Sequence, residues 1–278
     1  MRIEKNNQKA DNRAIGVFDS GLGGLTAVKE LMHTLPKENI VYFGDTGRVP
    51  YGTRSNETII KYVHQDIRFL LNFNIKLIVV ACGTASSVAL EKVRTQFEVP
   101  IVGVVKPAVE KAISLTHSKR IGIIGTPSTI NSKSYVRSIA QMAPDVKTFD
   151  KACPLFVPLV ENGYLDNQVA RLVAQEYLEP LKKERVDTII MGCTHYPLLK
   201  ETICKVMGEG VALVDPGAET AKYVKTFLDE KKTFAHEASK QQYRYFVSDS
   251  IAHFEELGSL FLQKKMQNCV EKIDIEQY

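Results

Sequence analysis

Two cysteines follow short hydrophobic runs at separate points of this 278-residue chain. Cys82 lies in the segment LIVVACGTAS and Cys193 in the segment TIIMGCTHYP. Each segment has a hydrophobic run, a small residue, the cysteine and a nearby threonine, in that order. A single free cysteine in such a place is most often buried and inert. Two in matching settings also favour a site in which both thiols act on one ligand.

Two thiols on opposite sides of a ligand suit the inversion of a stereocentre. Inversion removes a proton from one face of a carbon atom and returns a proton to the other face, and a single base does not easily reach both. General acid–base groups contribute roughly 10²- to 10⁴-fold each to such a reaction. Helix N-terminal amides and a neighbouring imidazolium favour a thiolate, and His195 lies two residues after Cys193.

Other cysteine chemistries fit the sequence less well. A thiol phosphatase needs an arginine a few residues after its cysteine, but the first arginine after Cys82 is Arg94, and Cys193 is followed only by Lys200. A hydrolase could pair Cys193 with His195, yet it would leave the second Cys-Thr segment without a role. The cysteines include no CxxC pair, which argues against a disulfide framework and a zinc site. We expect only packing roles for Cys153, Cys204 and Cys269.

Two loops are further candidates. The glycine-rich loop DSGLGGL, residues 19–25, would leave amides free at a helix N-terminus, which suits an anion. It does not match the GxGxxG pattern of dinucleotide sites. Asp19 and Ser20 either contact a small charged ligand there or cap the following helix. In the segment PYG, Tyr51 either lines a pocket or belongs to a simple turn.

These residues lie on a chain in which hydrophobic runs alternate with segments of helical length. The expected strands are 14–18, 39–44, 76–81, 100–104, 120–125, 187–192, 211–214 and 243–247, and the expected helices include 25–35, 57–72, 86–97 and 167–183. This alternation predicts an α/β fold with mainly parallel sheets flanked by helices. Ligands of such sheets bind beyond the carboxyl ends of the strands. Two similar domains facing each other would therefore place both cysteines across one cleft.

Composition narrows the class of protein. The chain has 36 basic and 32 acidic residues, a net charge of +4, and no basic patch that predicts a nucleic-acid partner. No apolar run approaches the roughly 20 residues of a membrane span. Residues 1–13, MRIEKNNQKADNR, lack the apolar core of a signal peptide and are expected to be a disordered polar tail. Residues 230–244 are expected to be a linker. We therefore expect a cytoplasmic protein.

The same segments resemble the glutamate racemase family of the aspartate/glutamate racemase superfamily, from about residue 15 to about residue 262. The matching segments are IGVFDSGLGGLTAVKEL, YFGDTGRVPYGTRS, VVACGTASS, IGIIGTPSTINSKSY, ACPLFVPLVENG, DTIIMGCTHYPLL, LVDPGAETA and YFVSDSIAHFEELGSLFL. Their order and spacing together make the resemblance specific.

This resemblance implies a racemase that interconverts L- and D-glutamate without pyridoxal phosphate, another cofactor or a metal. D-Glutamate made in this way is normally a building block of peptidoglycan. The resemblance also implies two α/β domains with the active site in the cleft between them. We place residues 1–106 and 217–278 in the first domain and residues 107–216 in the second. We expect a homodimer, with glutamate as the small-molecule partner.

The family's proton-carrying cysteines fall on Cys82, which would take the proton from D-glutamate, and Cys193, which would take it from L-glutamate. By the same resemblance, Asp19, His195 and Glu161 would assist these thiols. Substrate contacts are implied for Asp19, Ser20, Tyr51, Gly52, Gly83, Thr84, Thr126, Thr194 and His195.

The chain departs from the family at one position of this site. Family members typically read Ala-Cys-Asn-Thr where this chain has Ala81-Cys82-Gly83-Thr84. A hydrogen bond to a charged group is worth roughly 1.5–3 kcal/mol, so the sequence predicts that Gly83→Asn raises kcat/KM for glutamate by about tenfold or more. Two alternatives follow from Gly83: a racemase for aspartate or another acidic amino acid, or a ligand-binding paralogue with low activity.

Overall fold

The computed structural model describes residues 10–236 and 241–278. The strands are β1 (Ala14–Asp19), β2 (Ile40–Gly44), β3 (Ile75–Val80), β4 (Ile101–Gly103), β5 (Arg120–Gly125), β6 (Lys147–Ala152), β7 (Thr188–Met191), β8 (Ala212–Val214), β9 (Tyr243–Val247) and β10 (Val270–Lys272). The helices are α1 (Leu25–Thr34), α2 (Asn56–Leu70), α3 (Gly83–Val88), α4 (Leu90–Val93), α5 (Val105–Leu115), α6 (Pro127–Ser132), α7 (Ser134–Met142), α8 (Phe156–Glu161), α9 (Gln168–Lys183), α10 (Lys200–Met207), α11 (Pro216–Lys231) and α12 (Ile251–Leu262). Short 3-10 turns are η1 (Tyr51–Thr53), η2 (Arg94–Gln96), η3 (Tyr196–Leu199) and η4 (Ile275–Gln277).

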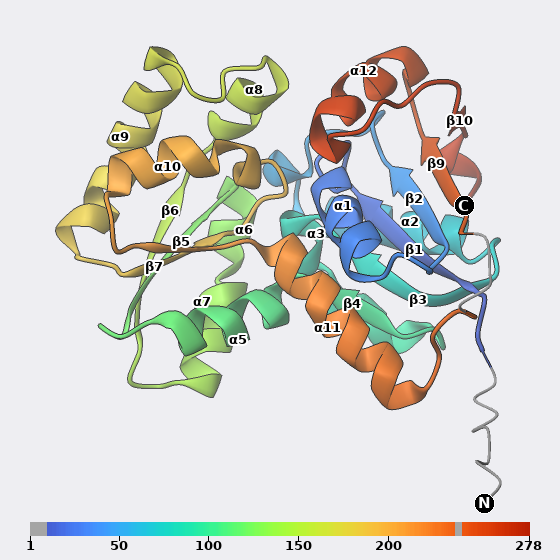
Figure 1. Cartoon of the computed structure of the whole chain (residues 1–278), viewed down its shortest axis with the longest axis horizontal. Helices are drawn as coiled ribbons and strands as arrows, with labels where there is room; N and C mark the ends of the chain where they lie inside the picture. Colours follow the sequence, from blue (N-terminus) through green and yellow to red (C-terminus); the bar gives the residue numbers. More distant parts are fainter. Residues whose placement is uncertain (1–9, 237–240) are drawn as a thin grey trace, which may run out of the picture.

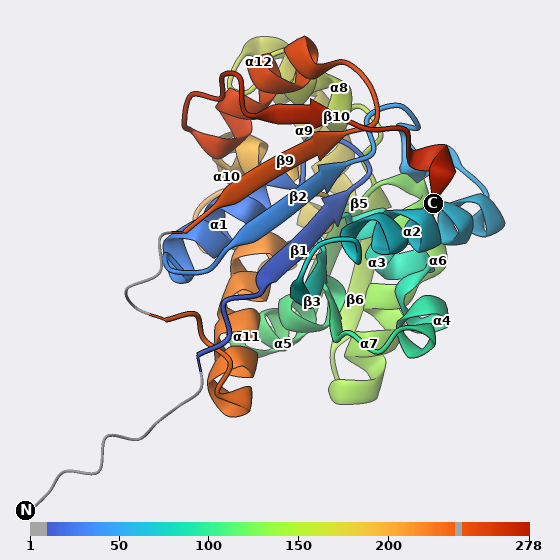
Figure 2. The same ribbon diagram turned by 90° about the vertical axis from the view of Figure 1, so that its right-hand side faces the viewer.

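The described strands form two parallel sheets. One has six strands in the order β10-β9-β2-β1-β3-β4, and the other has four in the order β6-β5-β7-β8. Every pair of neighbouring strands runs parallel. Helices flank both sheets, and α11 runs below the junction between them (Figure 1). The turned view shows β9, β2, β1 and β3 as successive strands of the larger sheet (Figure 2). The predicted α/β class is confirmed.

The eight strands expected from the sequence are present with small changes at their ends, whereas β6 and β10 were not predicted. Their sequences, KTFDKA and VEK, are rich in charge, and both strands lie at sheet edges. An edge strand keeps one side in solvent, so it lacks the continuous hydrophobic run of a buried strand such as β3, IKLIVV.

Three other expectations are corrected. The helix expected over 86–97 is divided into α3, α4 and η2. In the expected linker 230–244, residues 230 and 231 belong to α11 and residues 243 and 244 to β9, while 237–240 lie outside the described residues. Residues 1–9 of the expected tail also lie outside the described residues. Asp11, at the end of that tail, is held in the fold by Phe234 and Lys76.

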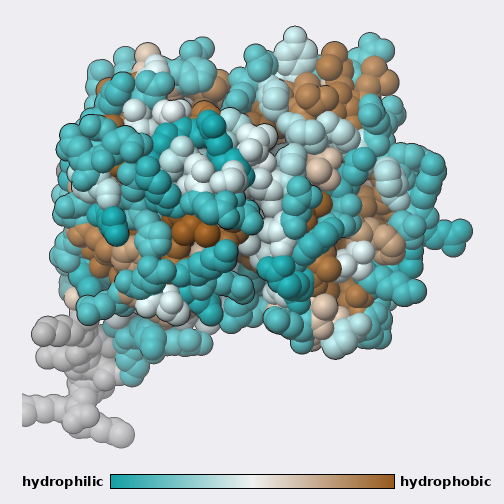
Figure 3. All heavy atoms as spheres, turned by 180° about the vertical axis from the view of Figure 1, so that it is seen from behind, coloured by the Kyte–Doolittle hydropathy of each residue, from teal (hydrophilic) through white to brown (hydrophobic). Residues whose placement is uncertain are grey.

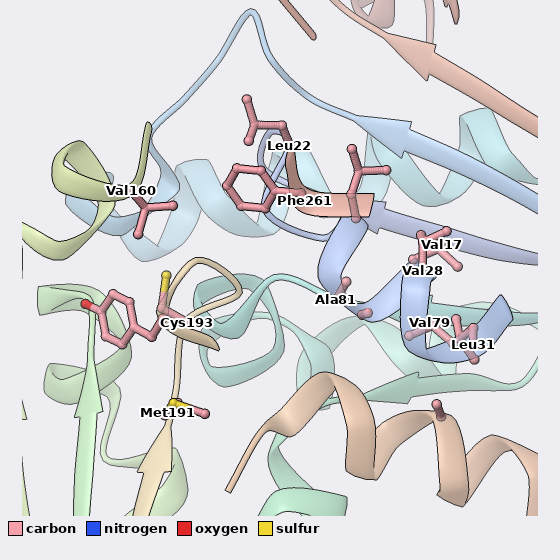
Figure 4. Packing of buried hydrophobic residues seen from close by; sticks show 14 of the residues in the cluster. Val17, Leu22, Val28, Leu31, Val79, Ala81, Val160, Met191, Cys193 and Phe261 are labelled. Carbon is pink, nitrogen blue, oxygen red and sulfur yellow. The ribbon is translucent and has the colours of Figure 1, made fainter. Parts of the chain in front are cut away.

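One hydrophobic cluster reaches across both sheets. It contains Val17 of β1 and Val79 of β3 together with Met191 of β7 and Phe261 of α12, and Figure 4 shows these side chains in one view. The face seen in Figure 3 is mostly hydrophilic, with scattered apolar patches, as on ordinary protein surfaces. Among the described residues, no helix combines the length and apolarity required to cross a membrane.

Candidate active site

The two cysteines lie beyond the carboxyl ends of strands in different sheets. Cys82 follows β3 as the N-terminal cap of α3, and its Sγ accepts a hydrogen bond from the Ala85 amide at 3.4 Å. Cys193 follows β7, just beyond the strand end that carries Met191 (Figure 4). The hydrophobic runs of both strands are buried, so each strand end is a rigid support for its thiol.

Both cysteines line a single cavity of about 270 Å³. The lining residues are Ser20, Gly21, Val49, Pro50, Tyr51, Gly52, Thr53, Cys82, Gly83, Thr84, Thr126, Pro127, Pro154, Val157, Pro158, Glu161, Cys193, Thr194 and His195. The set includes every residue expected at the site from the sequence except Asp19. It contains no lysine or arginine, so an anionic ligand there would depend on backbone amides, hydroxyl groups and His195.

His195 connects Cys193 to a carboxylate. Its Nδ1 lies 3.9 Å from Cys193 Sγ, and its Nε2 lies 2.9 Å from Glu161 Oε1. Burial lowers the pKa of His195, but the hydrogen bonds and charges of Cys193 and Glu161 more than offset this and raise it to about 10. The ring is therefore an imidazolium at neutral pH, with one N–H group directed at Cys193 and the other at Glu161.

Cys82 has the opposite surroundings. Burial raises the pKa of this thiol to about 12, and the negative charge of Asp19 acts in the same direction. Its hydrogen-bond partners, the Ala85 amide and the Ser20 hydroxyl at 3.5 Å, only partly offset these effects. At neutral pH, Cys82 is therefore a protonated thiol.

Asp19 lies behind the cavity wall rather than in it. Its side chain accepts a hydrogen bond from the Gly21 amide at 3.0 Å and one from Thr194 Oγ1 at 3.5 Å. Burial raises its pKa, although the His195 charge opposes this. The structure thus places Asp19 near both thiols but outside the set of residues that line the cavity.

Threonines join the two halves of the site. Thr84 Oγ1 lies 2.9 Å from Thr126 Oγ1 and 3.4 Å from Thr129 Oγ1. On the other side, Thr26 Oγ1 donates to the Thr194 carbonyl at 3.0 Å. Thr26 and Thr129 were not predicted from the sequence, because a lone threonine carries no signal of a distant partner.

Tyr51 lines the cavity, but its hydroxyl points into a buried cluster of carboxylates. The Oη atom lies 2.5 Å from Asp45 Oδ2 and 3.0 Å from Asp66 Oδ2. The phenol group therefore already has hydrogen-bond partners. The next residue, Gly52, packs closely against Thr126, because a Cβ atom at position 52 would lie only 2.9 Å from the Thr126 side chain.

Glycines bring the two halves of the site into close contact. A Cβ atom on Gly23 would lie 2.3 Å from Thr194 Oγ1 and 2.5 Å from His195 Nδ1. A Cβ atom on Gly83 would lie 2.2 Å from the Gly192 carbonyl oxygen. This contact argues against the prediction that asparagine at position 83 raises kcat/KM, because the first carbon of its side chain requires one of these two backbone segments to move.

The cavity also has lining residues that were not predicted from the sequence, namely Gly21, Val49, Pro50, Thr53, Pro127, Pro154, Val157 and Pro158. All of them belong to segments that carry the family resemblance, and that membership is the signal that could have identified them. Cys153 is buried as expected, whereas Cys204 and Cys269 are exposed and so do not pack as expected. Across residues 10–236 and 241–278, no group of three or more His, Cys, Asp or Glu side chains could hold a metal ion.

The parallel α/β fold brings one thiol from each of two sheets to the same cavity. This arrangement defines a class of isomerase that can exchange protons on both faces of one carbon atom. The model of the Asp/Glu/hydantoin racemase family matches residues 25–224. The chain belongs to this family. It is 47% identical over 254 residues to a glutamate racemase of Geobacter metallireducens, covering 91% of this chain and 94% of that protein.

Solved structures agree with this assignment. A glutamate racemase isoform of Bacillus anthracis matches with a TM-score of 0.91 and 37% identity, covering 95% of this chain and 98% of that one. The glutamate racemase of Francisella tularensis in complex with D-glutamate matches with a TM-score of 0.90 and 39% identity, covering 96% and 100%. An aspartate racemase homologue of Pyrococcus horikoshii is only 15% identical and shares the fold alone.

Proposed function

We propose that this chain interconverts L- and D-glutamate by proton transfer between Cys82 and Cys193, with no cofactor. The observation that carries the proposal is the single cavity of about 270 Å³ that both thiols line. This volume is at the small end of small-molecule sites, as a free amino acid requires. Glutamate is favoured over aspartate because the relatives that match at 41–47% identity over most of the chain are named glutamate racemases.

In the L-to-D direction, the Cys193 thiolate removes the α-proton and the Cys82 thiol donates a proton to the opposite face. The reverse direction exchanges the two roles. This assignment is supported by the asymmetry of the site, where the charged His195 lies 3.9 Å from Cys193 Sγ, whereas burial raises the pKa of Cys82 to about 12. Glu161 holds His195 in its charged form through the 2.9 Å contact.

The first-turn amides of α3, at Gly83 and Thr84, have no partner within the helix and are suited to a substrate carboxylate. Hydroxyl groups of Ser20, Thr126 and Thr194 line the same cavity. Asp19 would act on Cys82 and Thr194 from behind the wall rather than by touching the substrate.

The decisive test is circular dichroism of purified protein incubated with each glutamate enantiomer. We expect the signal of L- and of D-glutamate to decay to zero, both after exhaustive chelation and after treatment with hydroxylamine. Loss of activity that pyridoxal phosphate restores would contradict the proposal. Aspartate in the same assay separates the two acidic substrates, and binding of glutamate without racemisation would indicate the paralogue considered for Gly83.

The proposal extends to organisation and setting. The two domains, residues 1–106 with 217–278 and residues 107–216, are supported by the membership of their strands in separate sheets. A homodimer is part of the proposal and is tested by light scattering. A cytoplasmic supply of D-glutamate for peptidoglycan is the role that the family resemblance supports.

A further inference from the structure

A buried charged cluster lies directly behind the Tyr51 wall of the cavity. Asp45 and Asp66 have fully buried side chains, and the Arg48 side chain is 10% exposed. Arg48 Nε donates to Asp45 at 2.7 Å, and Arg48 Nη2 donates to Asp66 at 3.2 Å. The Arg48 guanidinium also lies 4.0 Å from the centre of the Tyr62 ring. One cation thus faces two buried carboxyl groups.

The hydrogen atoms in this cluster can be assigned from the contacts of Tyr51. Its Oη atom is close to Asp45 Oδ2 and to Asp66 Oδ2, at 2.5 Å and 3.0 Å. A phenol has one hydrogen and can donate to only one of them. The other contact joins two oxygens and needs a hydrogen that comes from a protonated carboxyl group.

Asp66 is the carboxyl group that can carry this hydrogen. Both oxygens of Asp45 already accept hydrogen bonds, Oδ1 from Ser248 Oγ at 2.8 Å and Oδ2 from Arg48 and Tyr51. Asp66 accepts from Arg48 through Oδ1 alone, which leaves Oδ2 free to donate. Asp45 is therefore the carboxylate and Asp66 the acid.

Charge balance leads to the same assignment. With both carboxyl groups ionised, the buried part of the cluster would carry a net negative charge, which is costly away from water. Burial raises the pKa of Asp66 well above its ordinary value, and the negative charges of Asp45 and Asp19 raise it further. The Arg48 charge and the Tyr51 hydrogen bond lower this pKa but only partly offset the rise. The remaining neighbours of Arg48 are the Gln65 side chain at 2.5 Å and the exposed Glu276 at 3.3 Å.

We propose that Asp66 is held as a carboxylic acid that donates to Tyr51, and that this chain of hydrogen bonds, which ends on Asp45 and is neutralised by Arg48, positions the Pro50–Gly52 wall of the active site. Asp45, Arg48 and Asp66 touch neither the cavity nor a thiol, so they are positioning residues. Through Tyr51 they fix the position of the cavity wall that faces Thr126. The kinetic consequence rests on the proposed function, whereas the protonation state does not.

Infrared difference spectroscopy tests the protonation state directly. At neutral pH we expect the carbonyl band of a protonated carboxylic acid in the wild-type protein, and we expect Asp66→Asn to remove it. Asp145→Asn, which changes an exposed carboxylate, is the matched control and should leave the band in place. Persistence of the full band in Asp66→Asn would overturn the proposal, whether or not the protein racemises glutamate.

Kinetics test the positioning role. Asp66→Ala should raise KM for both glutamate enantiomers by about tenfold and change kcat less, because the thiols are untouched. Asp66→Asn should have a KM close to that of the wild type, because its side-chain amide can donate a hydrogen bond to Tyr51 as the carboxylic acid does. KM should be as high in Asp45→Asn as in Asp45→Ala, because both variants lose the negative charge opposite Arg48. An equal rise in KM in Asp66→Asn and Asp66→Ala would overturn the proposal.

If the alanine variants fail to fold, Tyr51→Phe replaces them, because it removes only the hydroxyl and keeps the ring. The proposal then requires KM to rise by about tenfold with a smaller change in kcat. A KM equal to that of the wild type would overturn the positioning role.

Discussion

The carbonyl oxygen of Gly192 occupies the position in which a side chain on Gly83 would have to begin. A Cβ atom there would lie 2.2 Å from that oxygen, far inside van der Waals contact. Gly83 directly follows Cys82, and Gly192 directly precedes Cys193. The two cysteines lie beyond strands of different sheets. Any side chain at position 83 must therefore move one thiol-bearing loop away from the other.

This contact reverses the expectation for Gly83→Asn. We now expect the substitution to lower kcat/KM for both enantiomers by at least about tenfold, because displacement of about 1 Å at a reacting centre can cost on the order of 100-fold. Gly83→Ala should be similarly damaging, since it introduces the same Cβ atom. Gly47→Ala, with its nearest contact at 3.2 Å, is the control and should change kcat/KM far less. A higher kcat/KM in Gly83→Asn would show that the loops separate without loss.

Replacing either thiol of the cavity should abolish racemisation. We expect Cys82→Ser and Cys193→Ser each to lower kcat by at least about 10²-fold, because every turnover needs one group on each face. The exposed Cys204 supplies the control, and Cys204→Ser should keep the wild-type rate in the circular dichroism assay. Near-native racemisation by Cys82→Ser in both directions would rule out the two-thiol mechanism.

Loss of the Glu161 carboxylate should lower the pKa of His195. Glu161→Gln removes the negative charge 2.9 Å from Nε2 that helps to keep the ring protonated. The measurement is the NMR titration of the imidazole in labelled protein. The exposed Glu201 provides the comparison, since Glu201→Gln should leave the titration unchanged. An unchanged His195 titration in Glu161→Gln would mean that Cys193 alone maintains the charge.

The stability of the fold should depend on the ionisation of His195. Its pKa is about 10 in the folded protein and about 6.5 in an unfolded chain, so its stabilising contribution is complete below pH 6.5 and is lost as the pH rises through 10. Between these values, the free energy of unfolding should fall relative to that of His195→Asn by at least about 1.4 kcal/mol, the equivalent of one pKa unit. Urea denaturation of both proteins from pH 6 to pH 10 measures this difference, and parallel curves would contradict it.

The sequence alone was sufficient to place both cysteines directly beyond buried strands. The buried strands β3 and β7 appear as hydrophobic runs because a parallel sheet covered on both faces needs apolar side chains throughout. Cys82 and Cys193 follow these runs directly, so their positions beyond strand ends are local properties. The edge strands β6 and β10 have no such run, and only pairing with neighbours reveals them.

The tertiary structure decided the contacts that determine how these residues behave. His195 meets Glu161 across 34 positions of sequence, and Thr194 meets Asp19 across 175. Pattern and propensity describe neighbours along the chain, whereas pKa shifts and close packing depend on atoms brought together by folding. For this reason Gly83 looked like a missing hydrogen bond in the sequence, and in the structure it is a point of contact between the two halves of the site.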